Sequence, residues 1–407
     1  MNYLDYSIES IEQDSFLSIA KKVQIIIMEL DSFPLKRSVN ISHGRFLLHL
    51  VKKLRSPGNS RFPRLILFGH DIDMFPGDYP EADCILANEP EANIAGAVDS
   101  LLTGTVPPSP LTLEDLDKLP FPDRSPISSY AEHGGAIDSL PTLEKSTLIR
   151  TSSGCSNRCI FCQRKAWFRK FRKHSIPYVL SEFDELRQQN YKNIWVTDDN
   201  FTFDLKWAKA VLRGLIEKRL TRGMKIALSS WTRIDEEFLQ LARDAHVSII
   251  SFGVESANKD ILEFYRKTIQ LDEFRQLIRF ADSIGLYTVG NFIIGAPMET
   301  EETMAETFEY IKETPFDRVN IKTLDYMAGS SLYEMLPPGI KNTRQRHVFA
   351  CKENGLNNFP LGELKNKAKY FKDIFRESRS KRLKEKTKRF GPPYFLRGKE
   401  PPKSYNK

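Results

Sequence analysis

The feature that most constrains the fold is a regular alternation of strand-like and helical patterns between Thr147 and Met327. The strand-like runs cover residues 147–150, 193–197, 225–229, 247–251, 288–294 and 318–322, and a helical pattern follows each of the first five. Strands that alternate with helices form parallel sheets. We therefore predict an α/β fold, a partial (β/α)6 TIM-like barrel with its chemistry at the C-terminal ends of the strands. A doubly wound open sheet has the same periodicity and is the alternative.

A smaller α/β domain is expected before this barrel, because strand-like and helical runs also alternate within residues 1–104. This segment is short for an open α/β domain. Residues 105–146 contain seven prolines, which exclude long helices and indicate an extended linker. The barrel is assigned to residues 147–335. Residues 336–407 are assigned to a C-terminal helical region with a basic tail, with helical runs near 342–352 and 361–390.

The composition, with 41% hydrophobic and 28% charged residues, is typical of a soluble globular protein. The longest apolar runs are far below the ~18 residues of a membrane-spanning helix, so we expect no membrane partner and a cytoplasmic location. The net charge is +7, but residues 365–407 alone carry +12, so the rest of the chain is mildly acidic. The basic tail is either a solvated helix with a loose end or a surface for phosphates.

Three of the five cysteines lie within eight residues, directly after the first predicted barrel strand, as Cys155-x3-Cys159-x2-Cys162. An odd and clustered set of cysteines favours metal ligation over disulfides. Three thiolates can bind three irons of a 4Fe-4S cube and leave one iron without a protein ligand. A structural zinc site is the alternative, but it needs a fourth ligand, which only His174 or the distant Cys351 could provide.

The cysteine spacing, the aromatic Phe161 before the last cysteine and the barrel-like alternation together resemble the radical SAM superfamily. The resemblance covers roughly residues 147–335. It implies that the open iron binds S-adenosylmethionine (SAM) through its amino and carboxylate groups. It also implies reductive cleavage of SAM to methionine and a 5'-deoxyadenosyl radical, with the ring of Phe161 near the adenine.

The second strand end resembles the acidic turn with which the family holds the amino group of SAM. Asp198 and Asp199 are the candidate residues there. Carboxylates accept hydrogen bonds from an ammonium group. The alternative is an Asp-Asn turn that only caps the following helix.

The third and fourth strand ends resemble the family in the same way. Ser229 and Arg233 match positions where polar side chains approach the carboxylate of SAM, although Arg233 could instead pair with Asp235 or Glu236 at the surface. Glu255, in a Gly-x-Glu-Ser sequence, matches the glutamate that reaches the ribose hydroxyls.

The fifth strand runs into a sequence close to the family's Gly-x4-Gly-x-Pro-x-Glu-Thr, which makes Gly295 and Pro297 candidate cofactor-binding residues. Glycine permits close approach of the backbone to a ligand, and proline fixes the exit of the chain. Asp325 and Tyr326 follow the sixth strand and are expected to face the barrel mouth as substrate contacts.

The N-terminal segment, through Phe68-Gly69 and residues 82–91, looks like the later half of the cobalamin-binding domain that precedes many radical SAM enzymes. The motif Asp-x-His-x-x-Gly, whose histidine would ligate cobalt, is absent at all seven histidines. This implies a truncated Rossmann-like domain that packs rather than binds cobalamin. Some relatives hold cobalamin without that histidine, so cobalamin is possible but not favoured. The sequence Leu119-Pro-Phe-Pro122 resembles the linker that leads into the barrel of that family.

The resemblance implies a radical SAM enzyme that abstracts hydrogen from a small-molecule or natural-product substrate, with a flavodoxin or ferredoxin as electron donor and without cobalamin. A cobalamin-dependent radical SAM methyltransferase is the first alternative. An RNA-modifying radical SAM enzyme is the second, supported by the basic tail, but its extra N-terminal cysteines are missing, since only Cys84 precedes the barrel. The basic and aromatic stretch from Arg164 to His174 could bind a nucleotide-like substrate or line the barrel rim.

Overall fold

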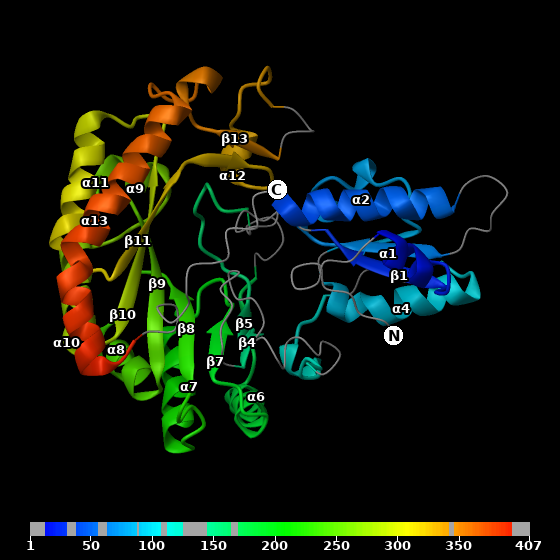
Figure 1. The fold of residues 1–407 in the computed structure, drawn as a ribbon, viewed down its shortest axis with the longest axis horizontal. Coiled ribbons are helices and arrows are strands. Elements are labelled where there is room, and N and C mark those ends of the chain that lie inside the picture. The colour runs from blue at the N-terminus through cyan, green and yellow to red at the C-terminus, as the bar shows by residue number, and fades with distance from the viewer. Residues whose placement is uncertain are drawn as a thin grey trace. The chain divides into compact units, whose positions relative to one another are not determined.

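The computed structural model describes residues 13–30, 38–55, 63–87, 89–106, 112–124, 145–163, 170–341 and 346–392. The chain divides into two compact units, Met1–Ser129 and Tyr130–Lys407 (Figure 1). Much of the predicted linker, and residues 164–169 of the basic and aromatic stretch, lie outside the described residues. Within the described ranges, no helix is long and apolar enough to cross a membrane.

The first unit is built on a small parallel sheet. Its elements are α1 (Gln13–Ala20), β1 (Ile25–Glu29), α2 (Ser38–Leu54), β2 (Arg64–Phe68), α3 (His70–Met74), η1 (Pro76–Asp78), β3 (Cys84–Leu86), α4 (Pro90–Thr103) and η2 (Leu116–Lys118). The three described strands run parallel in the order β1-β2-β3. Leu30, Leu50, Leu65 and Ile72 are fully buried in the core that joins α2 to the sheet. The predicted small α/β domain is therefore confirmed in class.

The second unit is built on a larger parallel sheet. Its barrel elements are β4 (Ser146–Ile149), β5 (Ser152–Ser153), β6 (Arg172–Lys173), α6 (Ile176–Gln188), β7 (Asn193–Val196), α7 (Leu205–Glu217), β8 (Lys225–Ser230), α8 (Glu236–Asp244), β9 (Val247–Glu255), α9 (Lys259–Phe264), α10 (Leu271–Ser283), β10 (Tyr287–Ile294), α11 (Glu301–Glu313) and β11 (Arg318–Thr323). After them come β12 (Asp325–Met327), α12 (Ser331–Glu334), β13 (His347–Phe349), η4 (Lys352–Asn354) and α13 (Leu361–Phe390).

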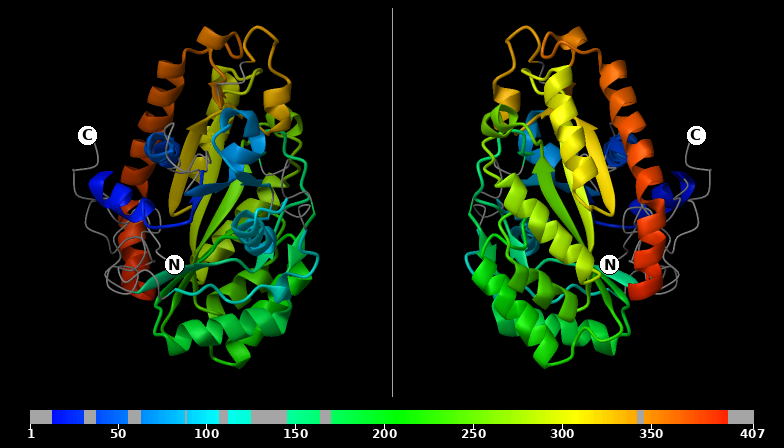
Figure 2. Two further views of the ribbon diagram at one scale, coloured as in Figure 1. Left: turned by 90° about the vertical axis from the view of Figure 1, so that its right-hand side faces the viewer. Right: turned by 90° about the vertical axis from the view of Figure 1, so that its left-hand side faces the viewer.

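The strand order identifies this sheet as a partial barrel. The described strands run parallel in chain order, β4-β7-β8-β9-β10-β11, and β4 does not pair with β11. Right-handed crossovers that always advance in one direction place every helix on the same face, whereas a doubly wound sheet reverses its order. Figure 2 shows the crossover helices on the outer face. The six predicted strands are confirmed, and the doubly wound alternative is excluded.

The helices begin where the sequence supplies a cap after each strand. Asp204, Asp235 and Asn258 each accept a hydrogen bond from a backbone amide three residues on, at the starts of α7, α8 and α9. Thr300 forms a reciprocal capping box with Thr303 at the start of α11. These side chains satisfy amides that a helix leaves without internal partners. These caps therefore define the residue at which each of these helices begins.

The inner face of the sheet changes character along the strands. Toward the strand starts, an apolar group is made by Ala227, Ile249, Tyr287 and Val289. Nearer the strand ends the chain instead provides amides and hydroxyls: Asn320 Nδ2 donates to Asn291 Oδ1 at 2.9 Å, and Asn291 Nδ2 donates to Ser251 Oγ at 2.8 Å. The inside of the barrel is therefore filled by apolar side chains near the strand starts and is polar nearer the strand ends.

The chain after the barrel differs from one expectation. We predicted a helix near residues 342–352, but β13 pairs antiparallel with β12 there, and residues 342–345 lie outside the described ranges. The predicted helix over 361–390 is confirmed as α13, which packs along β11. Its residues Leu364, Ala368, Phe371 and Phe375 join the core outside the sheet, whereas Leu383 joins the apolar group on the inner face. Therefore α13 passes around the edge of the sheet at β11.

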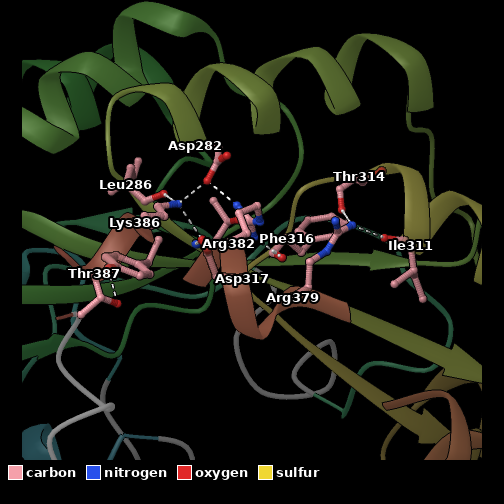
Figure 3. Close-up of polar contacts among 12 residues, drawn as sticks. Asp282, Leu286, Ile311, Thr314, Phe316, Asp317, Arg379, Arg382, Lys386 and Thr387 are labelled. Atoms are coloured by element: carbon pink, nitrogen blue, oxygen red, sulfur yellow. Dashed lines mark hydrogen bonds and ion pairs between the residues drawn. The ribbon is translucent and has the colours of Figure 1, made fainter. Parts of the chain in front are cut away.

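The basic residues of α13 explain how the helix is fixed there (Figure 3). Lys386 Nζ contacts Asp282 and Asp317 at 2.8 Å each and donates to the Leu286 carbonyl at 2.9 Å. Arg382 bonds the same two aspartates and the carbonyl of Phe316. The predicted solvated basic helix therefore describes only part of α13, because Arg382 and Lys386 are neutralised inside the protein.

Candidate cluster and SAM site

The cysteine loop begins on an anchor provided by Asp198. This buried carboxylate accepts hydrogen bonds from Thr151 N at 2.7 Å, from Thr151 Oγ1 at 2.6 Å and from Ser152 Oγ at 2.6 Å. Burial raises the pKa of Asp198, and these hydrogen bonds oppose the shift. Asp198 therefore ties the end of β7 to the segment that leads into the loop.

The neighbouring Asp199 has a different position. Its Oδ2 accepts a hydrogen bond from the amide of Gly154 at 3.2 Å, one residue before Cys155. The alternative was that this Asp-Asn turn caps the next helix. Neither aspartate does so, because Asp204 is the N-cap residue of α7. Both aspartates lie at the cysteine loop. Their contact with the amino group of SAM stays a prediction.

The three cysteines are partly exposed on this loop and lie within electrostatic reach of one another. Burial raises the pKa of the Cys159 thiol to about 12, and the nearby Lys267 ammonium opposes that shift. Burial likewise raises the pKa of Cys155. Because iron binds the thiolate, cluster binding displaces these protons.

The donor set of the loop fits a 4Fe-4S cluster. Three thiolates can each bind a different iron of the cube and leave the fourth iron without a protein ligand. Residues Cys155, Cys159 and Cys162 therefore fit the cluster that the sequence predicts.

The far side of the loop is held by two later segments. The carbonyl of Tyr265 accepts a hydrogen bond from Ile160 N at 3.3 Å, and the Tyr265 ring packs edge-on against Phe161 with centroids 5.2 Å apart. Leu332 N donates to the Ile160 carbonyl at 2.8 Å, and Gln163 Nε2 donates to the Ala328 carbonyl at 2.8 Å. The loop is thus clamped between the α9–α10 turn and the β12–α12 turn.

Tyr265 is also polar and completely buried. Its hydroxyl has no hydrogen-bond partner among the residues that the structure describes. Burial raises the pKa of this phenol well above its usual value, and the charges of Glu299 and Glu255 add to the shift. A protonated donor is therefore present beside Phe161. The sequence did not identify Tyr265, because no pattern in the neighbouring residues predicts that this tyrosine is buried at the site.

At the end of β8, Ser229 and Arg233 have different surroundings. Ser229 is half-buried, and its carbonyl accepts a hydrogen bond from Phe201 N at 3.2 Å. Arg233 is exposed, and its guanidinium lies 5.1 Å from the centre of the Trp231 ring. Asp235, which we considered as a partner of Arg233, is bound by Lys209 at 2.6 Å. Contact of Ser229 and Arg233 with the SAM carboxylate stays a prediction.

Glu255 ends β9 in a conformation that few side chains adopt, with φ at 72°. Such left-handed backbone costs about 1–3 kcal/mol in a non-glycine residue and is concentrated at functional sites. Its Oε1 lies 2.8 Å from Lys267 Nζ, and both side chains are buried. The sequence motif predicted Glu255 as a site residue but not Lys267. Helix α9 lies between them in the sequence, and no motif links the two residues.

The end of β10 is shaped by its own residues. Gly295 has φ at 95°, so a side chain there would strain the backbone. The buried Glu299 accepts hydrogen bonds from Gly295 N at 2.9 Å and Ala296 N at 3.3 Å, and Pro297 lies half-buried between them. Gly295 thus has a clear conformational role here. Cofactor contact by Gly295 and Pro297 stays a prediction.

The two residues after β11 separate in the structure. Asp325 Oδ2 lies 2.6 Å from His347 Nδ1 on the neighbouring strand β13, and this pair is partly exposed. Tyr326 is buried, and its phenol lies within electrostatic reach of Tyr265. Their role as substrate contacts stays a prediction.

A parallel partial barrel with three cysteines in the loop after its first strand defines a class of enzymes that bind a 4Fe-4S cluster and SAM at the strand ends. Residues 149–311 match the family described as the Radical SAM superfamily. Residues 149–311 therefore form a radical SAM domain, as the sequence suggested. The cofactors that we predicted, the 4Fe-4S cluster and SAM, are those of this superfamily.

Two curated relatives are methyltransferases by name. "Uncharacterized methyltransferase PH0819" of Pyrococcus horikoshii is 28% identical over 56% of this chain and 48% of its own length. "Cytidylyl-2-hydroxyethylphosphonate methyltransferase" of Streptomyces wedmorensis is 27% identical over 69% of this chain and 53% of its own length. The chain thus spans about half the length of these relatives.

Among solved structures, the chain resembles the radical SAM methyltransferase TsrM from Kitasatospora setae, solved with cobalamin and a 4Fe-4S cluster. The TM-score is 0.62 at 15% identity, covering 81% of this chain and 68% of TsrM. At this identity the likeness concerns the fold.

Proposed function

We propose that this protein is a radical SAM methyltransferase that acts on a small-molecule substrate. The observation that carries the proposal is the alignment with the phosphonate methyltransferase, which extends over 69% of this chain and so reaches well beyond residues 149–311. A second relative with a methyltransferase name and a solved methyltransferase of the same fold support it.

The roles of the chain's own residues follow from the site. Cys155, Cys159 and Cys162 hold the cluster, which with SAM supplies a 5'-deoxyadenosyl radical or a methyl group when bound. The remaining contacts to SAM come from the strand ends and the loop, as the resemblance implies: Phe161 toward the adenine, Asp198 or Asp199 toward the amino group, Ser229 and Arg233 toward the carboxylate, Glu255 toward the ribose, and Gly295 and Pro297 at the turn after β10. A flavodoxin or ferredoxin is the proposed electron donor.

Cobalamin does not fit the described residues of the first unit. Ligands of doubly wound sheets bind where the strand order reverses. The described strands β1-β2-β3 run in chain order without a reversal, and the sequence offers no Asp-x-His-x-x-Gly. We therefore do not favour cobalamin as a cofactor, although a solved structure of the same fold holds it. This observation favours a second candidate function, hydrogen abstraction from a small molecule without cobalamin.

The sequence supported an RNA-modifying function by the basic tail alone. It depended on the basic tail, and Arg379, Arg382 and Lys386 of that tail bind carbonyls and carboxylates of the barrel. Nucleic acid is accordingly not a proposed partner.

Anaerobically reconstituted protein, incubated with methyl-labelled SAM, dithionite and extracts of small molecules, tests these candidates. Methyl transfer predicts S-adenosylhomocysteine and a labelled product by mass spectrometry. Formation of 5'-deoxyadenosine with an unlabelled product would favour the second candidate. The absence of both, with four irons bound per chain, would contradict both. Cys159→Ala should lose iron, whereas Cys351→Ala, a matched control away from the loop, should keep it.

The same preparation tests cobalamin directly. Hydroxocobalamin is added before gel filtration, and the spectrum of the protein peak is recorded. We expect no stoichiometric corrinoid. A bound corrinoid would place the protein with the cobalamin-dependent methyltransferases and overturn the assignment above.

A further inference from the structure

Lys267 is a buried cation whose position is fixed by its backbone. It follows α9, and its amide donates to the Leu262 carbonyl at 2.8 Å. Two residues earlier, the Tyr265 carbonyl accepts a hydrogen bond from Ile160 in the cysteine loop. Only 6% of Lys267 is exposed. A buried ammonium in a fixed place beside the cysteine loop is costly unless it has partners.

The partners of Lys267 are two residues at the strand ends. Its Nζ lies 2.8 Å from Glu255 Oε1 and 5.4 Å from the centre of the Trp231 ring. The Trp231 amide is in turn held by Asn200 Oδ1 at 3.1 Å. One ammonium therefore joins the end of β8 to the end of β9 through an ion pair and a cation–π contact.

Gly253 leaves space for this ion pair. A Cβ at this position would lie 2.5 Å from Glu255 Oε1 and 2.9 Å from Lys267 Nζ. A side chain at position 253 would therefore displace the ends of both side chains. The absence of a Cβ at Gly253 leaves room for the two charges to meet.

We propose that Lys267 is a positioning residue of the cofactor site, which orients Glu255 for SAM and supplies a fixed positive charge beside the cluster. The inference rests on a cluster bound at the three cysteines and does not depend on which group is transferred. A cluster with three thiolates is anionic and becomes more so on reduction, so a nearby cation favours the reduced state. The carboxylate of Glu255 offsets part of this charge. Removal of the Lys267 charge should therefore lower the midpoint potential of the cluster, and removal of the Glu255 charge should raise it.

The test compares Lys267→Met with Lys267→Arg in the reconstituted holoenzyme. The midpoint potential of the cluster is measured by EPR-monitored redox titration, and SAM affinity by equilibrium dialysis. In Lys267→Met we expect a more negative potential and a SAM dissociation constant raised about 10- to 100-fold. Lys267→Arg keeps the charge and should keep the wild-type potential. An unchanged potential in Lys267→Met, or equal shifts in both variants, would overturn the proposal.

A second pair of variants covers the case in which Lys267→Met leaves Glu255 uncompensated and fails to fold. Glu255→Gln and the double variant Glu255→Gln/Lys267→Met differ only in the charge at position 267. The double variant should have the more negative potential, and equality would overturn the proposal. Wild-type protein that binds no 4Fe-4S cluster would overturn the cofactor site together with this proposal, which separates that failure from the failure of Lys267 alone.

Discussion

Two adjacent aspartates at the end of β7 show how neighbouring residues of one type take different tasks. Asp198 is buried under three hydrogen bonds from Thr151 and Ser152, whereas Asp199 accepts one from the amide before Cys155. Their order in the acidic turn predicts only that both lie near the loop. Which aspartate accepts the hydrogen bonds of Thr151 and Ser152 depends on how the cysteine loop packs against the end of β7. No local sequence pattern predicts that packing.

Replacing each aspartate by alanine should separate the two tasks. Asp198→Ala leaves buried donors without an acceptor and should lower the free energy of unfolding by about 3 kcal/mol. Asp199→Ala loses the 3.2 Å hydrogen bond from the Gly154 amide and should cost about 1 kcal/mol. Denaturant unfolding of the apoprotein measures both values, and equal losses would contradict the assignment of Asp198 as the anchor. Iron content should fall more in Asp198→Ala.

Glu299 gives a prediction about pH. Burial raises the pKa of its carboxyl, although hydrogen bonds from Thr303 and the Gly295 amide oppose the shift. Folding therefore favours the protonated form, so this contribution to stability is present below the unfolded-state pKa and is lost as pH rises through the folded-state pKa. The stability of the wild type relative to Glu299→Gln should fall as pH rises above about 4, measured by denaturant unfolding across pH.

Glu302 is the control for this experiment, because hydrogen bonds from its own amide and from the Thr300 side chain lower the pKa of its exposed carboxyl. A lowered pKa gives the opposite sign, since the contribution is present above the unfolded-state pKa and is lost as pH falls. The stability of the wild type relative to Glu302→Gln should thus rise with pH. The same direction for both variants would show that the burial of Glu299 is misassigned.

Among the elements, α13 is the one whose packing against the barrel is hardest to predict from the sequence. A helix with this many lysines and arginines has the composition of a solvated surface. Its partners Asp282 and Asp317 come from α10 and from the turn before β11, which are distant in sequence. The same limit explains β13: its strand character comes from pairing with β12, and pairing of this kind outweighs the local propensity on which our prediction of a helix was based.

Replacement of one lysine tests the fixed position of α13. Lys386→Met leaves the buried Asp317 with less compensation, and removal of one partner from such a pair costs about 3 kcal/mol. Lys384→Met, in the same helix but exposed, should change stability by about 0.5 kcal/mol or less. Thermal melting compares the two variants. Similar melting temperatures would show that the ion pairs at Asp282 and Asp317 do not hold the helix.

At the scale of the whole molecule, the barrel could be predicted because its strands and helices carry their own periodicity and their caps. The parallel order of the sheet then followed from the rules for crossover connections. The cysteine loop and the residues at the strand ends followed from motifs. What could not be predicted are contacts between segments without local signals, of which the pairs Glu255–Lys267 and Asp325–His347 are examples.

The path of α13 around β11 also bears on how the chain is made. A partial barrel leaves β11 at an open edge with unpaired backbone groups, and an edge of this kind can pair with strands of other chains and aggregate. During synthesis, all six strands leave the ribosome before residues 361–390 do. The open edge of the sheet at β11 therefore forms before α13 is available to pack against it. The apolar residues Phe371 and Phe375 then complete the outer core only after the barrel is already present. Nascent chains that stop short of α13 should therefore be the ones that chaperones retain.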